Sequence, residues 1–239
     1  MAQVEGVVMI DAIRFVVGAV VLSYASYTDM KTRTAENYLW YVMAGAGALL
    51  LALQFILFPS TANPFYLIYI PVVIGLVYLL YQFRLIFGGA DAKALFAIAI
   101  LAPFWPSFAF APSIMPFSIS VLTNALLAFL AMPICLFFYN LSRGDIRLPH
   151  AFIGYRVPIE RAQRSFVWPM QYLEGRTVKT RYFPRGGDTA GEMRLLRAYG
   201  LRRIWVTPKV PFMIPLTVGF LLSFMLGDIL FWIVSRILG

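Results

Sequence analysis

Two aspartates in this sequence are placed where they could act together on a peptide bond. Asp29 follows the first apolar segment, and Asp91 follows two glycines at the start of a later one. Two carboxyl groups held close together cannot both stay ionised, so they share one proton. The ionised group can then activate a water molecule while the protonated group polarises a carbonyl. Asp29 and Asp91 are therefore the candidate catalytic pair, and neither is assigned as the acid or the base.

The residues beside Asp91 suit such a site. Gly88 and Gly89 carry no side chains, so an extended substrate backbone can come close to the acid. We expect these two glycines and Ala90 to shape a substrate cleft, and Lys93 to neutralise charge nearby. The alternative interpretation of Asp91 is a helix cap, a position that aspartate favours.

The composition indicates that membrane helices position these residues. Of the 239 residues, 61% are hydrophobic and 13% are charged, which is too apolar for a soluble chain of this length. The apolar segments are continuous rather than alternating, which favours helices over a barrel. Six segments are long enough, or nearly so, to cross a bilayer of about 30 Å. We place them at residues 7–27, 37–58, 64–84, 92–106, 117–140 and 210–235.

The distribution of cations predicts the orientation. The connections after spans one and three carry Lys31, Arg33, Arg84 and Lys93, whereas the connections on the opposite side carry no charge. By the positive-inside rule the charged side is cytoplasmic, and both termini lie outside. The end of span one and the start of span four then meet at the cytoplasmic face, which puts both candidate acids at one depth of the plasma membrane.

The segment between spans five and six is predicted to be a small cytoplasmic α+β insert. The chain is thus divided into residues 1–140, 141–209 and 210–239. The insert holds fourteen Lys and Arg against five Asp and Glu. These charges are scattered among apolar residues, without a nucleic-acid-binding motif. We therefore interpret the excess as attraction to anionic membrane lipid, and nucleic acid is not an expected partner.

Local patterns inside the insert predict its elements. Residues 151–160 and 166–183 have the composition of strands, with a hairpin turn at Glu174-Gly175. The stretch from Thr189 to Glu192 matches a capping box, followed by a short helix that ends at Gly200.

Several residues outside the candidate site need partners or explanations. Asp11 and Arg14, three positions apart in span one, are expected to pair. A carboxylate in the membrane is costly, so Asp228 in span six should pair with Arg14 or Arg236. The small residues 44–48 are expected to make a close helix contact.

The single cysteine and single histidine do not predict a metal site. Cys135 is expected to pack inside span five, and His150 to lie at the surface. One cysteine excludes a disulfide within the chain and a Cys-based zinc cluster. No cofactor or metal is therefore predicted.

Taken together, these motifs resemble those of the type IV prepilin peptidase and preflagellin peptidase family of membrane aspartyl proteases. The resemblance rests on residues 88–93 (GGADAK), residues 27–33 (YTDMKTR) and Asn37, with the six-span layout. It implies that Asp29 and Asp91 are the catalytic aspartates. The implied substrate is an archaellin or pilin precursor with a short basic leader before an apolar helix, cut between the two at the cytoplasmic face.

The sequence departs from the family pattern at three points. Ala90 replaces the second motif glycine, and Glu36 replaces the proline usual before Asn37. The paired-cysteine loop of many bacterial members is missing, which favours the archaeal preflagellin branch without zinc or N-methyltransferase activity. Two alternatives stay open: an intramembrane protease of the signal-peptide-peptidase type, and a transporter that uses membrane-embedded acids.

Overall fold

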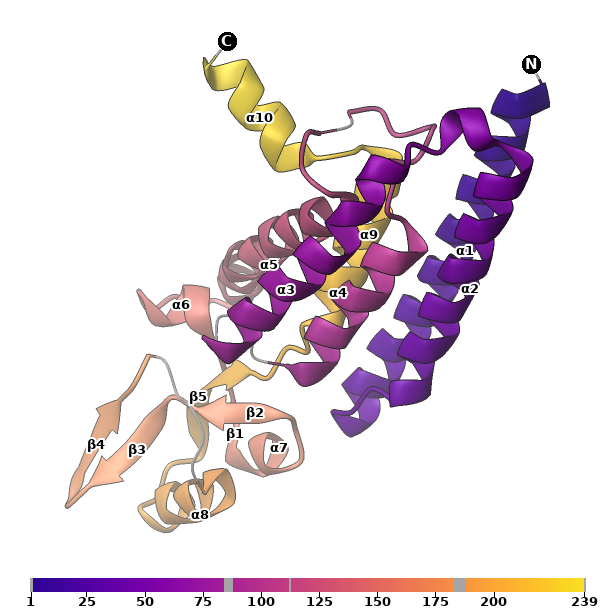
Figure 1. The fold of residues 1–239 in the computed structure, drawn as a ribbon. Helices are drawn as coiled ribbons and strands as arrows, with labels where there is room; N and C mark the ends of the chain where they lie inside the picture. The colour runs from indigo at the N-terminus through magenta and orange to yellow at the C-terminus, as the bar shows by residue number, and fades with distance from the viewer. Residues whose placement is uncertain (1, 84–87, 112, 183–187, 239) are drawn as a thin grey trace. The chain divides into compact units, whose positions relative to one another are not determined.

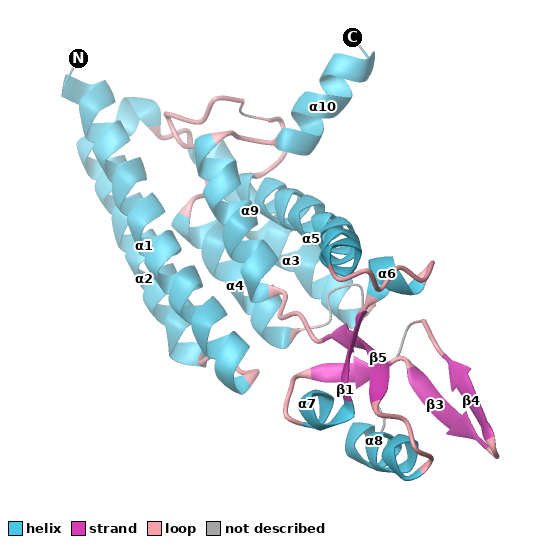
Figure 2. Ribbon diagram, turned by 180° about the vertical axis from the view of Figure 1, so that it is seen from behind, coloured by secondary structure: helices cyan, strands magenta, loops and turns pink. Residues whose placement is uncertain are grey.

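The structure is a computed structural model of the 239-residue chain. It describes residues 2–83, 88–111, 113–182 and 188–238. The chain divides into two compact units, which are residues 1–129 with 211–239, and residues 130–210 (Figure 1). Figure 2 shows that the described part of the first unit is helical, whereas the strands belong to the second unit.

The first unit is a helix bundle. Its helical elements are α1 (Ala2–Thr32), α2 (Asn37–Leu57), η1 (Pro59–Thr61), η2 (Pro64–Ile68), α3 (Tyr69–Gln82), α4 (Gly89–Leu101), the start of α5 (Phe117–Ser142), α9 (Met213–Met225) and α10 (Ile229–Leu238). The predicted spans two and five agree with α2 and α5 to within two residues. The second unit begins inside α5, at residue 130, earlier than the insert boundary placed at residue 141.

The expectation of six continuous spans is not confirmed. Among the described residues, four helices are long and apolar enough to cross a membrane, namely α1, α2, η2 with α3, and α5. The fourth expected span is α4, which has only 13 residues and is about 20 Å long at 1.5 Å per residue. It ends at Leu101, two residues before Pro103, where a proline would disrupt the helix.

The sixth expected span is two helices with a break between them. α9 ends at Met225 and α10 begins at Ile229. Gly227 between them has a φ of 88°, which glycine adopts without steric cost. The Asn124 side chain holds the break, because its Nδ2 donates to the Gly227 carbonyl at 2.8 Å and its Oδ1 accepts from the Ile229 N–H at 3.2 Å. The sequence predicted one continuous span at residues 210–235, because this apolar segment is long enough to cross a bilayer, and it did not predict this break.

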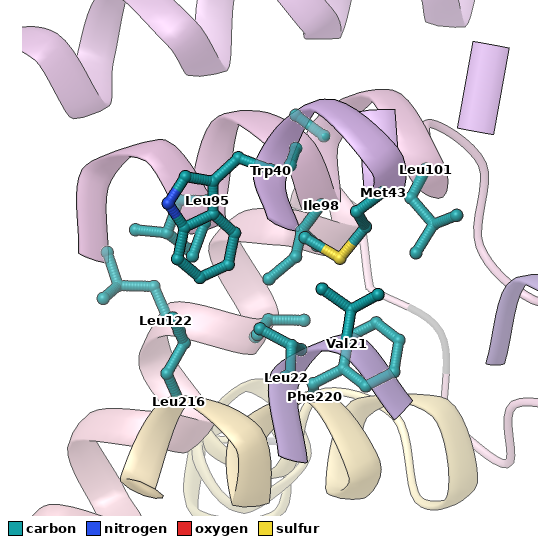
Figure 3. Close-up of a cluster of buried hydrophobic side chains, with 14 of the residues drawn as sticks. Val21, Leu22, Trp40, Met43, Leu95, Ile98, Leu101, Leu122, Leu216 and Phe220 are labelled. Carbon is teal, nitrogen blue, oxygen red and sulfur yellow. The ribbon is translucent and has the colours of Figure 1, made fainter. Parts of the chain in front are cut away.

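The core of the first unit surrounds α4. Leu95, Ile98 and Leu101 of this helix are completely buried, and they pack among side chains from α1, α2, α5 and α9 (Figure 3). A helix that is apolar all round is expected to be buried on all sides. This enclosure explains how α4 can be short, since irregular backbone at membrane depth is tolerated where protein covers it.

A close contact between α2 and α4 uses the predicted small-residue patch. A Cβ added at Gly47 would lie 2.5 Å from the Leu101 Cα and 2.7 Å from the Leu101 N. At Gly45, one half-turn away, a Cβ would meet nothing within 4 Å. The prediction of a close helix contact at residues 44–48 is therefore confirmed, and Gly47 makes it.

This difference predicts opposite effects for two matched substitutions. Gly47→Ala should lower the free energy of unfolding by about 1–3 kcal/mol, because the new methyl group meets backbone that cannot rotate away. Gly45→Ala should leave stability unchanged or raise it slightly, because alanine favours a helix over glycine. Thermal unfolding of both variants in the same detergent measures the effect. Equal midpoints for the two variants would contradict the contact.

The second unit contains two small antiparallel sheets with short helices. Strands β1 (Tyr155–Pro158), β5 (Arg203–Pro208) and β2 (Val167–Pro169) form one sheet in that order, and β3 (Gln171–Glu174) pairs with β4 (Thr177–Thr180). The hairpin predicted at Glu174-Gly175 is confirmed. Among the described residues, the end of α5 and three further helices complete the unit: α6 (His150–Ile153), α7 (Ile159–Gln163) and α8 (Thr189–Ala198). A separate apolar core lies between them, with Ile159, Leu196, Ile204 and Val206 completely buried.

The cap of α8 differs by one residue from the expected capping box. Asp188 is the N-cap, and its Oδ1 accepts the Gly191 N–H at 2.8 Å. Glu192 instead pairs with Arg181. The helix is followed by Gly200 at a φ of 97°, the usual place for glycine after a helix.

Candidate active site

Asp29 and Asp91 lie on helix ends at the same end of the first unit. Asp29 is in the last turn of α1, which stops at Thr32 before Arg33 adopts a positive φ of 59°. Asp91 is in the first turn of α4. The end of α1 and the start of α4 both lie at the lower end of the bundle in Figure 1. The fold thus brings to one end two acids that are 62 positions apart in the sequence.

The two carboxylates differ in exposure and are electrostatically linked. Asp91 is buried, with 8% of its surface exposed, whereas Asp29 is partly exposed. The Asp29 carboxylate lies close enough to act electrostatically on that of Asp91, and the Arg33 guanidinium acts on Asp29. The pair is therefore open to its surroundings on the side of Asp29.

The Asp91 side chain occupies the space left by the missing side chain of Gly88. A Cβ added at Gly88 would lie 2.3 Å from Asp91 Oδ2 and 2.9 Å from Asp91 Cγ. The Gly88 backbone is extended, with a φ of −106° and a ψ of 126°, so any residue could adopt it. Glycine is needed here for room rather than for backbone freedom. At Gly89 the atoms nearest to an added Cβ would be those of the Tyr81 side chain, at ordinary contact distances of 3.6–4.0 Å.

A hydrogen bond joins two further residues of the recognised motifs. Lys93 Nζ donates to Asn37 Oδ1 at 2.8 Å, which links the first turn of α2 to the second turn of α4. Sequence reasoning expected Lys93 to neutralise charge near the acids and noted Asn37 only as part of the resemblance. The pairing of the two was not foreseen.

Sequence reasoning also missed a buried hydroxyl pair next to Asp29. Ser26 Oγ lies 2.8 Å from Thr217 Oγ1 and donates to the Met213 carbonyl at 2.9 Å. Ser26 is the last buried residue of α1, and the residues after it are partly or fully exposed. The α1–α9 contact at Ser26 therefore fixes α1 one turn before Asp29. Hydroxyls inside apolar segments were the available signal, because they require partners in a membrane.

The other two aspartates of the first unit have structural partners. Asp11 Oδ1 accepts from Arg14 Nη1 at 3.0 Å, as predicted, and Asp11 Oδ2 accepts the Ser107 N–H at 2.8 Å. The partner predicted for Asp228 is wrong: Ser120 Oγ donates to it at 2.6 Å, and it caps α10 by accepting the Phe231 N–H. Within the described residues, no side chain holds Asp29 or Asp91 by a hydrogen bond in this way. A backbone hydrogen bond from Gly88 does act on Asp91, so its carboxylate has a backbone partner but, among the described residues, no side-chain partner.

Two predictions outside this site are also wrong. His150 is buried, with 3% exposed, and its ring packs 5.2 Å from the Tyr182 ring and 5.3 Å from the Trp205 ring. Burial lowers the pKa of His150, and the nearby Arg147 cation lowers it further. Cys135 is exposed rather than packed inside α5. Among the residues the structure describes, no three His, Cys, Asp or Glu side chains gather as metal ligands would.

A helical unit with two carboxylates at one end, neither held by another side chain among the described residues, is a candidate site for acid-pair chemistry. Residues 16–141 match the family described as the type IV leader peptidase family, and residues 146–229 match the archaeal peptidase A24 C-terminus, type II. The chain therefore belongs to the type IV leader peptidase family, as its motifs indicated, and is a peptidase with the helices of a membrane protein.

Similar proteins cover nearly the whole chain. The preflagellin peptidase of Methanococcus voltae is 27% identical over 90% of this chain and 96% of its own length. The preflagellin peptidase of Methanococcus maripaludis is 25% identical over the same shares. That of Methanocaldococcus jannaschii is 24% identical over 95% of this chain and 99% of its own length.

Proposed function

We propose that this protein is a membrane-embedded aspartyl endopeptidase that removes the short basic leader from archaellin or type IV pilin-like precursors. The observation that carries the proposal is the convergence of Asp29 and Asp91 at one end of the bundle, where neither carboxylate is held by another side chain among the described residues. The full-length similarity to preflagellin peptidases supports the substrate class.

In this proposal the two acids work as one unit. A water molecule enters beside the more exposed Asp29 and is activated by whichever carboxylate is ionised, while the protonated one polarises the scissile carbonyl. Asp29 lies beyond the last buried contact of α1, at Ser26. A small movement of this partly exposed turn can therefore close the pair onto a bound substrate.

Exposed tyrosines support a position for the acids at the membrane surface. Tyrosine is enriched where helices leave a bilayer. Six exposed tyrosines lie on the turns of α1, α2 and α3 nearest the acids: Tyr24, Tyr27, Tyr38, Tyr41, Tyr78 and Tyr81. Because Lys31, Arg33 and Lys93 lie at the same end of these helices, the positive-inside rule favours the cytoplasmic face for this end.

The test is cleavage of a precursor-like peptide by the protein in lipid nanodiscs. The peptide carries a basic leader, a glycine and an apolar helix, and mass spectrometry locates the cut. We expect one cut between leader and helix, and none in a matched peptide without the leader. A cut inside the apolar helix would instead indicate the signal-peptide-peptidase type. Absence of any cut, with ion or solute transport in liposomes, would favour the transporter.

A further inference from the structure

The second unit carries the whole net charge of the protein. Its fourteen Lys and Arg against five Asp and Glu give +9, which equals the formal net charge of the chain. The remaining residues carry six cations and six anions, so they balance. The excess of cations is therefore a property of the unit and needs an explanation there.

Three of these cations surround an open cavity. The cavity has a volume of about 930 Å³, and the charged side chains that line it, among the described residues, are Arg194, Arg197 and Lys209. Its floor is apolar, since it includes the buried side chains of Val167 and Met193. A cavity with cations at its rim and an apolar floor fits an amphipathic anion better than a small inorganic anion.

The cavity is close along the chain to the apolar helix α9. Lys209 is only four residues before Met213, the first residue of α9, and four residues span at most about 14 Å. The Lys209 N–H donates to the Phe166 carbonyl at 2.9 Å. Phe166 also lines the cavity, so this hydrogen bond holds two lining residues together. Phe166 itself is 51% exposed, and Lys209 Nζ lies 5.1 Å from the centre of the Trp168 ring. Aromatic and basic residues together are typical of segments at a lipid surface.

We propose that this cavity binds the headgroup of an anionic membrane lipid. Arg194, Arg197 and Lys209 hold the phosphate, and the apolar floor accepts the glycerol and the first methylene groups. Arg197 is partly balanced by Glu160, at 3.7 Å, so Arg194 and Lys209 supply most of the uncompensated charge. The lipid fastens the second unit to the membrane surface. This inference does not depend on the peptidase activity.

Binding of short-chain lipids to the full-length protein tests the proposal. Native mass spectrometry in a neutral detergent would compare dioctanoyl phosphatidylglycerol, dioctanoyl phosphatidylcholine and inorganic phosphate. We expect phosphatidylglycerol to bind at least roughly tenfold more tightly than phosphatidylcholine, since each basic residue near a surface adds to the attraction. Binding of inorganic phosphate as tight as that of phosphatidylglycerol would overturn the lipid assignment, because the apolar floor would then contribute nothing.

Two matched double variants separate a site from diffuse charge. Arg194→Gln with Lys209→Gln removes two cations from the cavity, and Arg176→Gln with Arg202→Gln removes two exposed cations that do not line it. The first pair should abolish the preference for phosphatidylglycerol, and the second should keep it. Equal loss in both would overturn the proposal. If the double variant of the cavity unfolds, Lys209→Gln alone still tests the site, and a severalfold loss of phosphatidylglycerol binding is expected.

Discussion

Replacing either Asp29 or Asp91 by asparagine should reduce leader cleavage by about 10³-fold, within the range attributed to acid–base catalysis. Asparagine has nearly the same shape as aspartate, but it can neither share a proton nor act as a base. Because the two acids are proposed to act as one unit, the double variant should be no slower than the slower single variant. The rate of cleavage of the leader peptide in nanodiscs measures the effect.

The control for these variants is Asp228→Asn. It removes the same charge from the same unit, but asparagine is also a favoured N-cap. Its Oδ1 can still accept the Phe231 N–H, and its Nδ2 can donate to the Ser120 hydroxyl, which donates to Asp228 in the unmodified protein. Its cleavage rate should stay within about twofold of the unmodified protein, since the residue lies outside the acid pair. Near-normal cleavage by Asp29→Asn or Asp91→Asn, in a folded protein, would remove that residue from the proposed pair.

The second large effect is expected at Gly88. In Gly88→Ala the new methyl group would fall 2.3 Å from Asp91 Oδ2, so the carboxylate must move. Misplacing a catalytic group by about 1 Å can cost about 10²-fold in rate. We expect a loss of this size in kcat, with little change in folding, because the extended backbone of residue 88 accepts alanine without strain.

Gly89→Ala is the matched control for Gly88→Ala. Its methyl group would lie nearest to the Tyr81 side chain, at 3.6 Å from the hydroxyl oxygen, so the Asp91 carboxylate keeps its place and kcat should change little. An equal loss in both variants would indicate that the glycines serve the approach of the substrate backbone. Equal and normal rates would mean that the position of the Asp91 carboxylate seen here is not the catalytic one.

The sequence alone determined the features that depend on neighbouring residues and on composition. The apolar content predicted membrane helices, and the bounds of α2 and α5 followed from uninterrupted apolar segments. The Asp11–Arg14 pair was predictable because residues three apart share a helix face. The motifs around Asp29 and Asp91 indicated the family to which the chain belongs.

Only the tertiary structure decided which distant groups meet. The break before α10 depends on Asn124, a residue about one hundred positions away, and Asp228 found Ser120 rather than an arginine. The Ser26–Thr217 and Asn37–Lys93 contacts likewise join separate helices. Hydropathy and spacing report the environment of each segment along the chain, because they reflect local burial and helix periodicity. They do not report how helices are rotated against one another, and that rotation determines the partner of each buried polar group.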